Sequence, residues 1–120
     1  GEEEAIADEE AARTRGRILT GSMYGLIGRF IAKEGHTDEL IEAMLAATGD
    51  MPGCLSYVVA RDPRNANAIW VTEVWDSAES HKASLELASV KSTIERAMPL
   101  IDSFGEHHET EPIGGYGLPR

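Results

Sequence analysis

Residues 54–75 read C-L-S-Y-V-V-A-R-D-P-R-N-A-N-A-I-W-V-T-E-V-W, and this stretch decides the fold. Its two halves, 54–61 and 68–75, are rich in β-branched and aromatic side chains, which favour strands. The residues between them, Asp62-Pro63-Arg64-Asn65, are of the types that form turns. We therefore predict two antiparallel strands joined by this turn.

The elements outside this hairpin follow from the spacing of apolar residues. Residues 24–32 are apolar at both odd and even positions except for Arg29, as in a strand that is buried on both faces. The other elements that we expect are a helix beginning near residue 37 and stopping by Gly49, a helix that Asp76 or Ser77 caps, a further helical segment at 90–98, and a strand at 100–107.

This order predicts an α+β protein with a ferredoxin-like βαββαβ plan. Four strands would form one antiparallel sheet, with both crossover helices on one face. The third strand is apolar on both parities, with Ile69 and Val71 opposite Trp70 and Val74. An uncovered apolar face of that size is unusual. We therefore expect a second copy of the chain to cover it, giving a homodimer that forms a dimeric α/β barrel.

The amino-acid composition limits the kinds of partner that the chain can bind. The 120 residues include 21 acidic and 11 basic side chains, for a formal charge of −10. This charge argues against binding nucleic acid and against docking on an anionic membrane. There is no apolar run of the length needed to span a bilayer. Cys54 is the single cysteine, so a reducing, cytoplasmic setting is the expectation.

The chain divides into three segments. Residues 1–22 hold six acids and three arginines, and we interpret them as a leader: a tag, a misassigned start or a native helical arm. Residues 23–111 form the expected domain. Residues 112–120 are rich in glycine and proline and are expected to be a loose tail.

Three stretches carry a family resemblance. They are K-E-G-H-T-D-E-L at 33–40, P-G-C-L-S-Y at 52–57 and T-E-V-W-D-S-A-E-S-H at 72–81. Their order and spacing resemble the antibiotic biosynthesis monooxygenase (ABM) family of dimeric α/β barrels. The resemblance implies a homodimer with a pocket in each subunit between sheet and helices. It also implies chemistry on phenols or quinols without a cofactor, while some relatives bind and degrade haem.

His81 is the candidate catalytic base. An imidazole titrates near neutral pH and suits removal of a phenolic proton. The family commonly carries Ala-His-Leu on this helix, whereas this chain has Ala83-Ser84-Leu85. His81 lies about one helical turn earlier and could face the same pocket. The alternative is an exposed surface histidine.

The other candidates also have structural alternatives. Tyr57 is a second catalytic candidate that could donate a hydrogen bond to a substrate oxygen, or it could cap the sheet edge. Trp75 and Trp70 could stack on a planar substrate, although tryptophans in strands more often pack in a core. They differ in parity, so one should face the helices and the other the open face. Ser84, at the family's histidine position, is the remaining candidate for substrate binding.

Two further sets of polar residues have structural interpretations. Glu73 is expected to form a cross-strand ion pair with Arg29 or Arg61. His107 and His108 are adjacent, so their side chains should point to opposite faces and should not share a metal. We expect neither a metal nor a cofactor.

The resulting functional hypothesis is a cofactor-independent monooxygenase that oxidises a quinol or phenolic substrate with dioxygen. An electron-rich phenolate can itself give an electron to dioxygen once a base has removed its proton. The alternative is a non-catalytic dimer of the same fold that binds a small molecule. Haem binding is a weaker alternative, because those relatives use an asparagine in the first strand and residues 24–32 contain none.

Overall fold

A computed structural model describes residues 22–46 and 48–119. The expected leader therefore lies outside the described residues, apart from Ser22. The described elements are, in chain order, β1 (Tyr24–Ala32), α2 (Thr37–Ala46), β2 (Cys54–Arg61), β3 (Ala68–Trp75), α3 (Ala78–Ser84), α4 (Ala88–Ala97), the short 3-10 helix η1 (Met98–Leu100) and β4 (Ile101–Thr110). The predicted α+β, ferredoxin-like plan is confirmed, with the second crossover divided into two helices.

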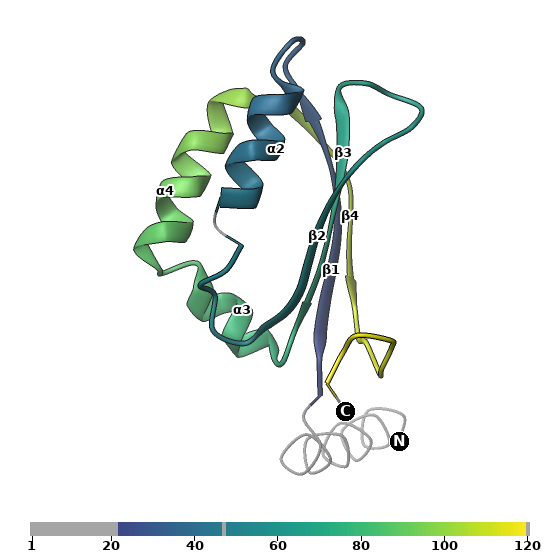
Figure 1. Cartoon of the computed structure of the whole chain (residues 1–120), viewed down its shortest axis with the longest axis vertical. Coiled ribbons are helices and arrows are strands. Elements are labelled where there is room, and N and C mark those ends of the chain that lie inside the picture. The colour runs from purple at the N-terminus through teal and green to yellow at the C-terminus, as the bar shows by residue number, and fades with distance from the viewer. Residues whose placement is uncertain (1–21, 47, 120) are drawn as a thin grey trace, which may run out of the picture.

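The four strands form one antiparallel sheet in the order β2-β3-β1-β4. The hairpin predicted at 54–75 supplies β2 and β3, and β3 lies next to β1 in the middle of the sheet. Figure 1 shows the helices α2, α3 and α4 on one side of the curved sheet, while the other side is not covered by any described helix. The two sides are called the helix face and the open face below.

Strand register assigns each side chain to a face. Tyr24 pairs with Trp75 and Leu26 with Glu73, so these four residues share the helix face. On the other strand that borders β3, Tyr57 pairs with Glu73. Because side chains alternate along a strand, Trp75 faces the helices and Trp70 lies on the open face, as their parity predicted.

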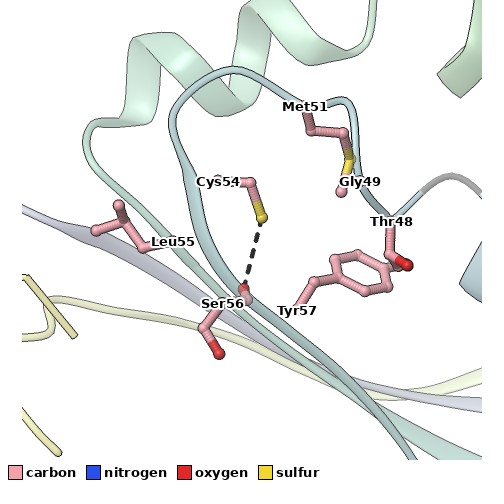
Figure 2. A pocket seen from close by; sticks show the side chains of 7 residues that line it. All are labelled: Thr48, Gly49, Met51, Cys54, Leu55, Ser56 and Tyr57. Atoms are coloured by element: carbon pink, nitrogen blue, oxygen red, sulfur yellow. Dashed lines mark hydrogen bonds between the residues drawn. The ribbon is translucent and has the colours of Figure 1, made fainter. Parts of the chain in front are cut away.

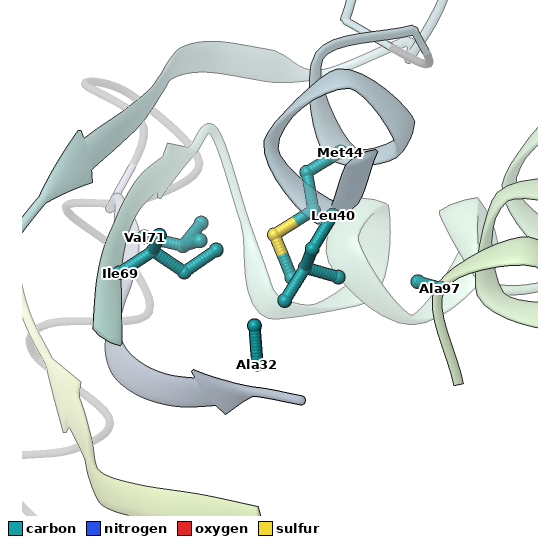
Figure 3. Close-up of a cluster of buried hydrophobic side chains, with 6 residues drawn as sticks. All are labelled: Ala32, Leu40, Met44, Ile69, Val71 and Ala97. Atoms are coloured by element: carbon teal, nitrogen blue, oxygen red, sulfur yellow. The ribbon is translucent and has the colours of Figure 1, made fainter. Parts of the chain in front are cut away.

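The core joins α2 to the sheet. Leu40 and Ile69 are both fully buried, and Met44 and Val71 are nearly so. Figure 3 shows Leu40 and Met44 extending from the helix toward Ile69 and Val71 on the strand, with Ala32 beside them. Burying a side chain of this size contributes about 1.5–3 kcal/mol. These contacts hold α2 against the middle of the sheet.

The second crossover consists of two short helices. The Ser77 hydroxyl accepts a hydrogen bond from the Ser80 amide at 3.1 Å, which caps α3 as predicted. The chain then turns at residues 85–87 and begins again as α4 at Ala88. This break allows α3 to cover one end of the sheet while α4 packs beside α2 (Figure 1).

The last strand is longer than predicted. We expected it at 100–107, but β4 runs from Ile101 to Thr110. Its outer half pairs with β1 through the backbone, ending with Gly25 opposite Thr110. Its side chains there are exposed and polar, so the apolar pattern gave no sign of the extension. No helix among residues 22–46 and 48–119 is long and apolar enough to cross a membrane.

Candidate functional site

A cavity of about 280 Å³ lies between the helix face of the sheet and the helices. This volume is near the lower limit of about 300–1,000 Å³ for small-molecule pockets. Its wall is mostly apolar. The apolar residues that line it are Phe30, Met44, Met51, Trp75, Leu85, Val90, Ile94, Ala97, Met98, Ile101 and Phe104.

The cavity brings together most of the residues predicted to form the site. Tyr57, Trp75, His81 and Ser84 all line it, from β2, β3 and α3. A fifth residue, Glu73, lines it as well. An apolar cavity with a few converging polar groups is the usual form of a small-molecule site.

His81 is held between two aromatic rings. Its imidazole centroid lies 5.4 Å from the ring of Tyr24 and 5.4 Å from that of Trp75. The side chain is half-buried by these contacts, unlike the exposed surface histidine that was the alternative interpretation. Among the described residues, neither ring nitrogen has a hydrogen-bond partner. Neither nitrogen is therefore bonded to another group in the part of the chain that the structure describes.

Glu73 is the residue whose role sequence analysis misjudged. We expected an ion pair with Arg29 or Arg61, and this prediction is wrong. The Arg29 Nε atom lies 3.0 Å from Asp62, and the Arg61 Nη2 atom lies 2.6 Å from Asp38.

Glu73 is instead bonded within its own strand. The Trp75 indole N–H donates a hydrogen bond to Glu73 Oε1 at 3.0 Å. The two residues are separated by two positions and therefore lie on the same face of β3. Their shared parity was the signal in the sequence that could have placed Glu73 in the pocket.

Tyr57 lies opposite Glu73 in the strand register. Burial, followed by the negative charge of Glu73, raises the pKa of the Tyr57 phenol well above its usual range. The phenol therefore stays protonated at neutral pH and can donate a hydrogen bond. This state suits stabilisation of a substrate oxygen better than removal of a proton.

A second hollow of about 240 Å³ adjoins the cavity. It is lined by residues of the segment that connects α2 to β2 and of the start of that strand. Figure 2 shows Tyr57 and Met51 on its border, with the Cys54 sulfur turned toward the Ser56 carbonyl oxygen, 3.6 Å away. Tyr57 and Met51 line the main cavity too. These two side chains therefore form a shared wall between the hollows.

Ser84 and Trp70 have other partners. Ser84 is only 4% exposed, and its hydroxyl donates to the His81 carbonyl at 2.6 Å. The Ser84 hydroxyl therefore donates its hydrogen bond within α3 rather than to a molecule in the cavity. Trp70 lies on the open face, outside the cavity, where its indole N–H donates to Asp62 at 3.3 Å. The Arg29 guanidinium lies 6.0 Å from the centre of the Trp70 ring.

In the described part of the chain, no three histidine, cysteine or acidic side chains are grouped closely enough to bind a metal ion. Cys54 is a free, half-buried thiol, and burial raises its pKa. A thiol with a raised pKa is a poor nucleophile and metal ligand. The ionisable residues that line the main cavity are His81, Tyr57 and Glu73.

Comparison with known proteins agrees with the fold described above. The sequence profile of the ABM (antibiotic biosynthesis monooxygenase) family matches residues 23–96. A crystal structure from Chloroflexus aurantiacus J-10-fl, whose protein bears the name of that family, is 57% identical, with a TM-score of 0.80. The match covers 82% of this chain and 100% of that one.

More distant structures share the fold alone. Proteins bearing the family name from Nitrosomonas europaea and Caulobacter crescentus CB15 are 16% and 17% identical, with TM-scores of 0.68 and 0.66. The matches cover 83% and 84% of this chain, and 97% and 98% of theirs. No curated protein matches the chain. With a profile that matches more than half of its length and a close structural relative, this chain belongs to the antibiotic biosynthesis monooxygenase family.

Proposed function

We propose that this protein is a cofactor-independent monooxygenase that oxidises a quinol or phenolic aromatic substrate with dioxygen. The family name supports the reaction class. The observation that carries the proposal is the placing of His81 in an apolar cavity, between two aromatic rings and with free ring nitrogens.

In this proposal His81 takes the proton from a substrate hydroxyl. The resulting phenolate gives an electron to dioxygen, and the two radicals combine at a ring carbon. Loss of water then leaves one oxygen atom on the substrate. For a quinol, one quinol and one dioxygen give one hydroxyquinone and one water, so no external reductant is needed. Tyr57 donates a hydrogen bond to the developing oxyanion.

A specific observation favours a second candidate, a dimer that binds a small molecule without turnover. The family's usual histidine position holds Ser84, whose hydroxyl is bonded to the His81 carbonyl. That hydroxyl cannot replace an imidazole as a base near neutral pH. Under this alternative the cavity binds aromatic molecules but His81 has no catalytic role.

We also propose that the protein acts as a homodimer through the open face of its sheet. That face carries Ile27 and Val74, which are half-buried, and Val58, which is 53% exposed. A second sheet packed against it would remove these side chains from water, and burial of apolar surface is the main favourable contribution to association.

Oxygen consumption with a quinol, measured with an oxygen electrode, separates the two candidate functions. We expect turnover that chelators do not inhibit, and a loss of about 100-fold or more in His81→Ala, the range for a missing general base. The matched control is His36→Ala, because His36 is exposed and contacts Glu39 outside the cavity.

Equal turnover in wild type and His81→Ala would remove His81 from the mechanism. Binding of the quinol with no oxygen consumption by the wild type would establish the non-catalytic alternative. A Soret shift on titration with haem would favour the haem-binding relatives instead.

A further inference from the structure

The Glu73 carboxylate has one oxygen that the described residues leave free. Oε1 accepts the hydrogen bond from the Trp75 indole, while Oε2 has no partner among the described residues. No buried side-chain oxygen or nitrogen in that part of the chain lacks a partner. Oε2 is therefore accessible, and because Glu73 lines the cavity, a molecule bound there can reach it.

No described cation neutralises this carboxylate. Arg29 and Arg61 pair with aspartates, as noted above. The remaining ion pairs among the described residues have exposed side chains outside the cavity lining: His36–Glu39, Lys91–Glu86 and Arg96–Glu42. An ionised Glu73 therefore gives the cavity a negative charge surrounded by mostly apolar walls.

Beside His81, Ser84 and Thr93, the cavity lining contains Tyr57 and Glu73, which have opposite preferences for a ligand. The neutral Tyr57 phenol is a hydrogen-bond donor. Its O–H can donate to a hydroxyl oxygen or to a carboxylate oxygen of the ligand. Glu73 is an acceptor that favours a donor and repels an anion. A repulsion between like charges in a poorly solvated cavity is stronger than one neutral hydrogen bond. Glu73 should therefore decide the charge of the ligand.

We propose that Glu73 is a specificity-determining residue of this cavity: its free Oε2 accepts a hydrogen bond from an uncharged one- or two-ring aromatic ligand, and its charge excludes analogues that carry a carboxylate. The size limit comes from the cavity volume of about 280 Å³. The proposal rests on the proposed function only in taking this cavity as the binding site, and it requires no turnover.

The test is the binding of three matched ligands near neutral pH: naphthol, naphthamide and naphthoate, substituted at the same ring carbon. Calorimetry should show that the wild type binds naphthol and naphthamide at least about tenfold more tightly than naphthoate, a typical effect of an uncompensated like charge. In Glu73→Gln the affinity for naphthoate should rise by about tenfold, which removes the preference.

Two further variants make the result specific. Glu109→Gln removes the same charge from a residue that does not line this cavity, and it should keep the wild-type preference. Glu73→Met replaces the carboxylate with apolar atoms of similar size, so it provides a second variant if Glu73→Gln fails to fold. It too should admit naphthoate.

The proposal is overturned if the wild type binds naphthoate as tightly as naphthol, if it binds none of the three ligands, or if a folded Glu73 variant keeps the preference. Failure of the proposed oxygenase is a separate outcome, because it is measured as absent oxygen consumption. A protein without turnover can still discriminate among these ligands through Glu73.

Discussion

The imidazole of His81 packs edge to face on the indole of Trp75, with ring centroids 5.4 Å apart and an interplanar angle of 69°. This contact joins the last turn of α3 to the helix face of the central strand β3. The same indole holds Glu73 through its N–H. One buried tryptophan, 1% exposed, therefore positions two of the ionisable groups of the cavity, His81 and Glu73.

Replacing Trp75 by phenylalanine should reveal the value of its hydrogen bond. Trp75→Phe keeps an aromatic ring beside His81 but leaves Glu73 without its donor, and losing the donor to a half-buried carboxylate costs about 1–3 kcal/mol. The matched control is Trp70→Phe, because Asp62 retains Arg29 and the Arg64 amide as donors. Urea unfolding should show the larger loss in Trp75→Phe, and equal losses would contradict this assignment.

The packing of α2 gives a second matched pair. Leu40 is fully buried against the sheet, whereas Leu45 on the same helix is 47% exposed. Leu40→Ala should lower the free energy of unfolding by about 2–5 kcal/mol, since it leaves a hole in a packed core. Leu45→Ala should cost well under half of that, because little of its surface is buried. If both variants unfold at the same urea concentration, the helix does not pack as described.

High pH should destabilise the protein through two tyrosines whose pKa values are raised in the folded state. Burial raises the Tyr57 pKa far above its usual value, and burial with the Glu109 hydrogen bond raises that of Tyr24 to about 12. An unfolded tyrosine titrates near pH ~10. As the pH rises past that value, the unfolded chain loses phenolic protons that the folded chain retains, so stability falls. Below that pH the phenols are protonated in both the folded and the unfolded chain, so the full stability is kept.

Tyr57→Phe isolates this effect. The variant should lose less stability than the wild type between about pH 9 and pH 11, because one of the raised phenols is gone. Tyr116→Phe is the control, since Tyr116 is fully exposed, and it should follow the wild-type curve. Urea midpoints at several pH values provide the measurement. Parallel curves for wild type and Tyr57→Phe would show that the Tyr57 phenol is not buried as described.

The elements that sequence analysis predicted are those with a regular apolar period. The hairpin at 54–75 and the first strand have dense β-forming residues, and Ser77 is a recognisable cap. The extension of β4 to Thr110 was missed because its backbone pairing with β1 leaves no apolar pattern. Of the candidate site residues, His81, Tyr57, Trp75 and Ser84 line one cavity, and their roles there stay predictions. The position of Glu73 in the cavity lining was missed because a charged residue in a strand suggested an ion pair.

Contacts between segments that lie far apart in the chain could not be predicted from the sequence. Tyr24 reaches His81 only because β1 lies next to β3 and α3 folds back across the end of the sheet. The separation of Trp70 from the cavity could be expected from parity. Its bond to Asp62 could not, because that depends on how the turn after β2 folds over the open face.

The proposed dimer is tested by placing a charge on the open face. Val58 is 53% exposed on β2 and belongs to the surface that we expect a second copy to cover. In Val58→Glu a carboxylate would be buried without a partner, at a cost of several kcal/mol, so the protein should become monomeric. Leu45→Glu introduces the same charge at an exposed apolar residue on α2, away from that face, and should leave the mass unchanged. Light scattering after size exclusion measures both. A wild type with the mass of one chain, or a Val58→Glu variant that stays dimeric, would show that the open face is not the interface.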